Sequence, residues 1–488
     1  MKNEKLQDAI GMIGDDLIER AKNDKKPSRV QRWLVVAACF AVVVLVSVII
    51  FAGELGRDEL PLKPGNTDTP IHCEPDFGNT FMPLADSSFP ARVKFVAYGE
   101  SENGNEAYKE WFEDRLSYTR PYRQAEIDIN DYLVKLMNTF LGEAKENTVF
   151  SPINVYIALS MLAEISDTEG QEEILNLLNV GSIEELRARC KIMWNAHYYR
   201  DGVTTSILSN SLWLDDSTDY DRDMLNNLTE NYFASVFAGE MGSDKMNNTI
   251  RKWIYERTNG KLDMYGQNIK TTPETMIALL STLYFRAGWE SAFSEENTKK
   301  GYFYNDNYKM ICDFMNSEEE VVYYYGDKFS AVEIPLGNNC SMNIFLPDEG
   351  IGVNSMISDA QFLQAAFTPE NYGNKGEYTV NITLPKFDVS SETDMIAGLK
   401  KLGITQVFEH LSVEYDLEDA YVDEIKHAAR VSIDEEGCEG AAYTILNIYN
   451  GTPPEPDCIM QFKVNRPFVF VITSAVGAPL FTGVVYEV

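Results

Sequence analysis

Residues 380–405 read VNITLPKFDVSSETDMIAGLKKLGIT, and this stretch decides the fold class. Residues 380–384 alternate between apolar and polar side chains, which is the period of a strand with one buried face. Residues 395–402 instead carry apolar side chains at helical spacing. Residues 467–473 form a continuous apolar run, which is typical of a strand buried on both faces. Because strands and helices mix along the chain without strict alternation, we predict an α+β fold.

Two helices are predicted ahead of this stretch. The first carries four apolar side chains on one face and opens the main folded part, and these are Ile129, Leu133, Leu136 and Phe140. After the segment NTVFSP at residues 147–152, residues 157–162 continue a second helical apolar stripe. The main folded part is therefore expected to begin near residue 125.

Composition and charge exclude several classes of function. The chain has 488 residues, of which 44% are hydrophobic, so it is long enough for a large core and for about three domains. Its formal net charge of −33 would repel nucleic acid and anionic membrane surfaces, so we expect no nucleic-acid partner. The sequence contains no H-E-x-x-H, G-x-S-x-G, G-x-G-x-x-G or C-x-x-C motif, and its seven cysteines are scattered. We therefore expect that the protein has no cofactor and no metal site, and that it is not an enzyme.

An apolar segment near the N-terminus predicts a membrane span. Residues 33–52 read WLVVAACFAVVVLVSVIIFA, and as a helix these twenty residues would extend about 30 Å. Basic residues precede the segment and acidic residues follow it, which indicates a cytoplasmic N-terminus over residues 1–32. The expected localisation is that of a single-pass membrane protein with its main domain outside the cell. A cleaved secretory signal and a lipoprotein cleavage box at residues 36–39 remain alternatives.

The segment between the span and the main domain is less regular. Residues 53–80 are rich in Gly, Pro, Asp and Asn, which is the composition of a linker. Residues 106–116 could form a helix, and residues 92–97 alternate like a short strand. We assign residues 53–124 as a linker and an N-terminal extension of unassigned role, and residues 125–488 as the folded domain.

The folded domain resembles a known family, the serpins, over about residues 125–488. The resemblance is specific because many short motifs recur in the family's order. They are NTVFSP at 147–152, W at 253 with TNGK at 258–261, LYF at 283–285 ahead of Trp289, IFLPDEG at 344–350, LPKF at 384–387, LGIT at 402–405, DEEG at 434–437, NRPF at 465–468 and PLFTG at 479–483.

The resemblance implies a fold and a mechanism. The fold would have a large central, mainly antiparallel sheet with further sheets, surrounding helices and an exposed reactive loop. The protein would inhibit serine proteases as a suicide substrate: the protease cleaves the loop, the loop inserts into the central sheet, and the protease stays covalently trapped. With the apolar N-terminal segment, the chain looks like a membrane-anchored, bacterial-type member, and a monomer is expected. A non-inhibitory, serpin-fold binding protein at the cell surface is the alternative.

The sequence of the loop tests whether it could become a central strand. The expected hinge consists of Gly437, Cys438, Glu439, Gly440, Ala441 and Ala442. One parity of the loop holds only small or apolar side chains, as a buried strand face requires, and its members are Cys438, Gly440, Ala442, Thr444, Leu446 and Ile448. No proline interrupts the loop before Pro453, so every backbone N–H up to there could join a sheet. The pattern favours an inhibitory member.

The resemblance also assigns the reactive bond and an insertion gate. Counting forward from Glu435 places the cleaved bond between Gly451 and Thr452, with Tyr449 and Asn450 as neighbouring candidates, whereas counting backward from Asn465 places it near Pro456. No Lys or Arg lies between Cys438 and Met460. The expected targets are therefore elastase-, chymotrypsin- or subtilisin-like proteases rather than trypsin-like ones. Glu435, Lys386 and Trp289 would together control where insertion starts.

Two further features follow from the same motifs. The family's buried polar cluster is matched at Ser151 and His427, whereas Asn154 and Ser281 exchange Ser and Asn between the other two positions. This exchange predicts either a compensated hydrogen-bond network or a weakened one. Cys438 and Cys458 flank the expected cut, and a disulfide between them would lock the loop, although two thiols are the simpler expectation.

Overall fold

The computed structural model describes residues 77–78, 80–85, 89–95, 104–217, 220–305, 308–411, 422, 425–438 and 459–488. Contacts between Cα atoms divide the chain into two units, Met1–Pro75 and Asp76–Val488, and all described residues belong to the second. The predicted cytoplasmic segment, the apolar segment at residues 33–52 and the first part of the linker lie outside the described residues.

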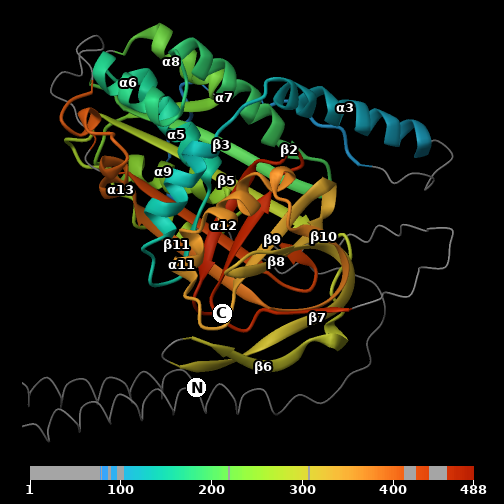
Figure 1. Cartoon of the computed structure of the whole chain (residues 1–488). Helices are drawn as coiled ribbons and strands as arrows, with labels where there is room; N and C mark the ends of the chain where they lie inside the picture. Colours follow the sequence, from blue (N-terminus) through green and yellow to red (C-terminus); the bar gives the residue numbers. More distant parts are fainter. Residues whose placement is uncertain are drawn as a thin grey trace, which may run out of the picture. The chain divides into compact units, whose positions relative to one another are not determined.

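The described helices surround two sheets (Figure 1). They are α3 (Gly104–Gln124), α4 (Asn130–Leu136), α5 (Pro152–Ile165), α6 (Thr168–Leu177), α7 (Ile183–His197), α8 (Arg222–Asn231), α9 (Asp244–Arg257), α10 (Asp263–Gly266), α11 (Val353–Ile357), α12 (Ala360–Phe367) and α13 (Ile396–Lys401). Short helical turns are η1 (Met137–Leu141), η2 (Glu295–Asn297), η3 (Gly337–Asn339), η4 (Pro369–Asn371) and η5 (Gln406–Phe408). In Figure 1, α6, α7 and α8 gather at one end of the unit and the β6–β7 hairpin lies at the other.

The central sheet has seven strands in the order β11-β12-β13-β5-β3-β2, with β4 paired to β3. Their bounds are β2 (Tyr199–Arg200), β3 (Thr204–Asp215), β4 (Ala234–Gly239), β5 (Ile277–Gly288), β11 (Phe387–Asp394), β12 (Lys426–Ile433) and β13 (Gly437–Cys438). All of these pairs are antiparallel except β3 with β4.

The second sheet has nine strands in the order β1-β16-β15-β9-β8-β7-β10-β14, with β6 paired to β7. Its strands are β1 (Thr148–Phe150), β6 (Lys299–Tyr304), β7 (Lys309–Tyr325), β8 (Phe329–Leu336), β9 (Cys340–Pro347), β10 (Lys375–Pro385), β14 (Met460–Lys463), β15 (Phe468–Thr473) and β16 (Pro479–Val485). Strand β14, which follows the predicted loop, runs parallel to β10 from Val380 to Thr383.

The core forms where local sequence signals and burial agree. Helix α5 begins after Ser151, whose side chain accepts a hydrogen bond from the N–H of Asn154, and Pro152 occupies its first turn. Nearly every side chain of α5 is buried, because the helix lies in the main hydrophobic cluster beneath the central sheet. Strand β12 alternates between buried and half-buried residues, as expected when a sheet is covered unequally on its two faces.

The predicted fold class is confirmed, since helices combine with large, mainly antiparallel sheets in an α+β arrangement. The helix expected from residue 129 is present as α4 and η1, and the strand expected at residues 380–384 lies within β10. The helix expected at residues 106–116 is longer than expected and forms α3. Trp111 holds α3 against the domain by donating its indole N–H to Asp201 Oδ2 at 3.1 Å.

The localisation predicted from the sequence is corrected. Within the described residues, no helix combines the length and the apolar character that a bilayer span requires. The longest of them, α3, has 21 residues but carries charged side chains such as Glu106 and Arg123 along its length. The assignment of a single-pass membrane protein with a cytoplasmic N-terminus and an extracellular domain is therefore withdrawn.

Candidate functional site

Among the strands that the structure describes, the central sheet is interrupted between β5 and β12. Strand β13 consists of only two hinge residues, and it is the only described strand between them. Cys438 pairs with Ile433 of β12 and with Ala287 of β5, and Gly437 pairs with Gly288. Beyond this short wedge, the described part of the chain contains no pairing between β12 and β5. The two hinge residues therefore begin a strand that the rest of the described structure does not continue.

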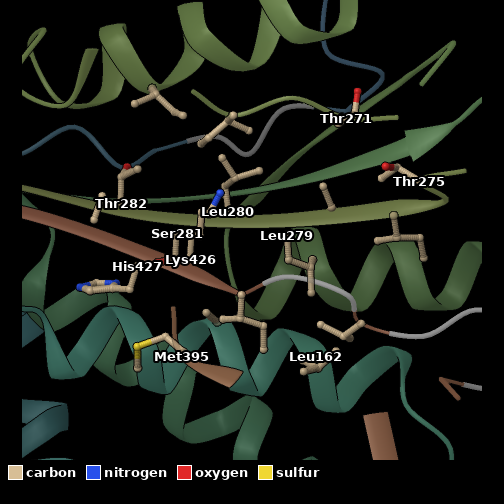
Figure 2. Close-up of a pocket in the computed structure, with 18 of the residues that line it drawn as sticks. Leu162, Thr271, Thr275, Leu279, Leu280, Ser281, Thr282, Met395, Lys426 and His427 are labelled. Atoms are coloured by element: carbon tan, nitrogen blue, oxygen red, sulfur yellow. The ribbon is translucent and has the colours of Figure 1, made fainter. Parts of the chain in front are cut away.

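A cavity of about 720 Å³ occupies this interruption (Figure 2). One side wall comes from β5 between Ile277 and Thr282, and the other comes from β12 between Lys426 and Ala428. Figure 2 shows Leu279 to Thr282 and the pair Lys426 and His427 around the same space. The cavity therefore runs along two strand edges, and the connection between α10 and β5 also lines it.

The cavity is bounded by helices on both faces of the sheet. Leu159 and Leu162 of α5 line it on one face. Ile254 of α9 and Tyr265 of α10 also line it. On the α9 side, Leu280 and Ala428 pack against the hydrophobic cluster that contains Trp253. A space that reaches both faces of a sheet has the shape left by a missing strand.

The predicted polar cluster lies at this cavity, but only part of it is hydrogen-bonded. The backbone N–H of Ser151 donates to Nε2 of His427 at 2.9 Å, which ties the start of α5 to β12. Asn154, Ser281 and His427 all line the cavity. The buried atoms Asn154 Oδ1 and Ser281 Oγ have no hydrogen-bond partner among the described residues. The compensated network considered for these two positions is therefore not formed in this structure.

His427 is neutral at neutral pH. Its residue is 7% exposed, and burial lowers its pKa to about 4. Because Nε2 accepts the hydrogen bond from Ser151, the proton of the neutral ring resides on Nδ1. Protonation of Nε2 would remove this acceptor and place a charge in the cavity wall.

The predicted gate residues meet at the start of the hinge. Lys386 Nζ and Glu435 Oε2 are 2.7 Å apart, and Thr298 Oγ1 donates to Glu435 Oε1 at 2.7 Å. Burial acts to raise the pKa of Glu435, but the hydrogen bonds from Lys386 and Thr298 outweigh it and lower that pKa. The hydrogen bond to Glu435 in turn raises the pKa of Lys386. Both groups are therefore charged at neutral pH.

Trp289 fixes the turn that leads into the hinge. Its indole Nε1–H donates to the carbonyl of Asp434 at 2.9 Å, and its backbone N–H donates to the carbonyl of Glu436 at 3.0 Å. The Asp434 side chain accepts from the N–H groups of Glu436 and Gly437, which closes a tight turn. The chain thus reverses directly from β12 into the interruption.

Gly437 is required by close packing at this turn. A Cβ atom at this position would lie 2.3 Å from the carbonyl oxygen of Ala287 and 2.6 Å from the Cα of Gly288. Both of these are backbone atoms, which cannot move aside like the end of a side chain. The glycine lets the hinge approach β5 closely enough to pair with it.

The structure places some predicted site residues and not others. The described ones are Ser151, Asn154, Ser281, His427, Trp289, Lys386, Glu435, Gly437 and Cys438. The other predicted positions lie outside the described residues. They are the hinge residues Glu439, Gly440, Ala441 and Ala442, the expected reactive bond between Gly451 and Thr452, and Cys458. Cys438 is buried between β12 and β5.

Two contributors to the site are absent from the predicted set. Asp434 could have been recognised, because Asp three positions before Gly is a turn signal. Thr298 carries no such signal, since it contacts Glu435 across 137 positions of sequence. Within the described ranges, no group of three or more His, Cys, Asp or Glu side chains could hold a metal ion.

The comparisons with known proteins agree with this geometry. A family model described as "Serpin (serine protease inhibitor)" matches residues 128–488. A serine protease inhibitor of Cyanea capillata is 28% identical over 348 residues, which cover 68% of this chain and 90% of that protein. Iripin-2 of Ixodes ricinus is 26% identical, with 70% and 88% of the two chains covered.

Solved structures show the same fold. The native state of tengpin, a thermophilic serpin, superposes with a TM-score of 0.65 at 23% identity and covers 84% of this chain and 100% of its own. Nothing in these comparisons supports the membrane-anchored, bacterial-type subdivision. Serpins are generally protease inhibitors rather than enzymes. The match over residues 128–488, together with the interrupted central sheet, establishes that this chain belongs to the serpin family.

Proposed function

We propose that this protein inhibits serine proteases as a suicide substrate, with the cleaved loop inserting between β5 and β12. The observation that carries the proposal is the interruption of the central sheet, which the hinge residues Gly437 and Cys438 have already entered. Each strand that borders the interruption has an edge from which backbone groups could pair with a new strand.

The registers at β13 predict where the inserted residues would lie. Continuing them down the sheet brings each even-numbered loop residue beside one residue of β12 and one of β5. The expected neighbours are Val431 and Phe285 for Gly440, Ala429 and Leu283 for Ala442, and His427 and Ser281 for Thr444. Of these neighbours, all but Ser281 are buried, which agrees with the small or apolar character of this parity.

Insertion would also complete the polar cluster. In the continued register, the hydroxyl group of Thr444 lies on the same face as His427 and Ser281, where Ser281 Oγ has no described hydrogen-bond partner. Although Ser281 as a residue is only partly buried, its Oγ atom is buried, and a buried hydroxyl without a partner costs about 1–3 kcal/mol. The inserted strand would therefore relieve a cost that the interrupted sheet carries.

The covalent step follows the ordinary chemistry of serine proteases. The protease serine oxygen attacks the carbonyl carbon of the residue before the cleaved bond, for which we propose Gly451. The bond to the Thr452 nitrogen breaks, and this nitrogen leaves as an amine after taking a proton from the protease histidine. Insertion would then have to outpace hydrolysis of the resulting ester.

The same loop favours particular proteases. No basic side chain lies between Cys438 and Met460. A protease whose specificity pocket contains a buried acid would therefore find no basic side chain to bind in this loop. We propose elastase-, chymotrypsin- or subtilisin-like proteases as targets. At the gate, we propose that the Glu435–Lys386 pair and Trp289 hold the turn from which insertion proceeds.

A matched pair of variants tests the mechanism. Ala442→Glu would bring an unpaired carboxylate into the buried face of the sheet, whereas Ala441→Glu would lie on the opposite face, opposite Arg430 in the continued register. After mixing with a chymotrypsin-like protease, wild type and Ala441→Glu should give an SDS-stable covalent complex. Ala442→Glu should be cleaved and release active protease.

Three outcomes would contradict the proposal. Equal trapping by both variants would mean that insertion on this parity is not required. Cleavage of wild type without trapping, or no reaction with any of the three protease classes, would instead favour the non-inhibitory binding protein. Gly440→Arg provides a second inward-facing substitution with the same expected loss of trapping.

A further inference from the structure

Residues 77–89 precede the part of the chain that matches the family model, and their described positions run along β4 and α9. The N–H of Leu84 donates to the carbonyl of Val236 at 2.7 Å, and the N–H of Val236 donates to the carbonyl of Ala85 at 2.8 Å. This segment therefore pairs with β4, which is itself paired to β3.

Phe81 anchors the segment in a notch made by a glycine. A Cβ atom added to Gly239, the last residue of β4, would lie 2.5 Å from the Phe81 ring. The backbone N–H of Phe81 donates to Thr249 Oγ1 at 2.9 Å, and Lys245 Nζ lies 3.9 Å from the centre of its ring. Thr249 and Lys245 both belong to α9, so Phe81 joins α9 to β4.

Two further phenylalanines extend these contacts to the other end of α9. The Phe77 ring lies 5.3 Å from that of Tyr255, with the guanidinium of Arg251 at 5.4 Å from its centre. The Phe89 ring lies 5.1 Å from the guanidinium of Arg257, the last residue of α9, and stacks on Trp194. The segment therefore holds α9 from its first turn to its last.

Helix α9 lies where an inserted strand would need room. In the continued register, the large outward side chains of the loop are Tyr443, beside Ala428 and Thr282, and Ile445, beside Lys426 and Leu280. Ala428 and Leu280 pack against the hydrophobic cluster that includes α9 residues, and Ile254 of α9 lines the cavity. For these side chains to enter, the packing of α9 on the sheet has to loosen.

We propose that the described residues of this segment, 77–78, 80–85 and 89, form a strap that holds α9 on the central sheet and slows strand insertion. The inference rests on the proposed function, because it concerns the barrier to the same insertion. The strap would keep the interrupted sheet from accepting its own loop before a protease has cut it.

The test compares two substitutions that remove the same contact from opposite sides. Phe81→Ala removes the ring, and Gly239→Ala fills the notch in which the ring lies. Phe112→Ala, on the exposed surface of α3, is the matched control. All variants are made in the full chain, and the probe is a synthetic peptide with the sequence of residues 439–450, EGAAYTILNIYN.

Annealing of the peptide is followed on native gels. Phe81→Ala and Gly239→Ala should each anneal the peptide about three- to tenfold faster than wild type, the effect expected from losing one aromatic contact. The double variant should be no faster than either single one, because both remove one interaction. Phe112→Ala should match wild type. Equal rates in wild type and both strap variants would overturn the strap.

A second measurement separates this inference from the proposed function. Hydrogen exchange of the α9 amides should accelerate in Phe81→Ala and Gly239→Ala whether or not the protein traps a protease. Unchanged exchange in α9 would refute the strap even if wild type forms covalent complexes. Failure of wild type both to anneal the peptide and to trap any protease would refute the proposed function, whatever the exchange of α9 shows.

Discussion

Individual residues around the interruption combine roles in packing and in charge. His427 lines the cavity and also accepts the hydrogen bond that fixes the start of α5. Glu435 is buried, but it remains charged because Lys386 and Thr298 both contact its carboxylate. Protonation of either side chain is therefore expected to change the free energy of unfolding.

The first prediction at this scale concerns acid stability. The pKa of His427 is about 4 in the fold, whereas an unfolded chain binds the proton below about 6.5. The unfolded state thus binds more protons between these values, so the free energy of unfolding falls as the pH decreases through this window. The loss due to His427 should reach about 3 kcal/mol between pH 7 and pH 4.

Urea unfolding of wild type and His427→Gln at pH 7 and pH 4 measures this loss. His197 is also buried, with its pKa lowered to about 4, so wild type should lose the contributions of both histidines and the variant only that of His197. His197→Gln is the corresponding control. An identical loss in wild type and His427→Gln would contradict a neutral, buried His427.

At the scale of elements, the hinge turn is held by groups from three other segments. Lys386 lies between β10 and β11, Thr298 lies just before β6, and Trp289 follows β5. All three contact the turn between β12 and β13. The turn therefore depends on the relative positions of both sheets.

A prediction follows for the Glu435–Lys386 pair. Lys386→Met should lower the free energy of unfolding by about 1–2 kcal/mol, because the buried Glu435 carboxylate loses its cation. Glu435→Gln should cost less, since the amide can still accept from Thr298 while the half-exposed Lys386 stays hydrated. Equilibrium unfolding at pH 7 makes the comparison.

The pH dependence gives this prediction its sign. Because the pKa of Glu435 is lowered in the fold, its contribution is present above the ordinary pKa of a carboxyl group and is lost as the pH falls through the lowered value. The difference between wild type and Lys386→Met should therefore shrink in acid. A larger cost for Glu435→Gln than for Lys386→Met would show that the pair does not act as described.

On the scale of the whole molecule, the described part of the central sheet is interrupted between β5 and β12. A cavity of about 720 Å³ lies between these two strands, in a domain whose described residues otherwise form a large, continuous core. An inserted strand that fills this cavity and pairs with β5 and β12 would stabilise the fold. The intact protein is therefore expected to be less stable than its cleaved form.

Heating before and after cleavage tests this expectation. Wild type that has been cut once in the loop should unfold about 10 °C or more above the intact protein, because the inserted strand fills the cavity. Calorimetry of the cleaved and intact forms at the same concentration measures the shift. The cleaved Ala442→Glu variant should show a much smaller rise, and an unchanged midpoint for cleaved wild type would argue that the loop does not enter the sheet.

Several properties of the protein could be predicted from the sequence alone because they depend on patterns among residues that are close together in the sequence. The alternation at residues 380–384 predicts β10, and the apolar spacing from Ile129 to Phe140 predicts α4 and η1. The ordered motifs predict the family, which the match over residues 128–488 confirms. The resemblance also implies the proximity of Glu435, Lys386 and Trp289. In the structure Lys386 contacts Glu435, and Trp289 donates to the neighbouring residue Asp434. Their gating role stays a prediction.

Only the tertiary structure decided which distant surfaces meet. Whether Asn154 and Ser281 bond to each other depends on the separation of α5 and β5, and in the interrupted sheet neither Asn154 Oδ1 nor Ser281 Oγ has a described partner. The notch at Gly239 for Phe81 joins residues far apart in sequence, so no local period records it. Periodicity reports whether a residue faces a core, because burial repeats with the geometry of one helix or strand. It does not report which partner covers that face, because that choice is made by contacts across the whole fold.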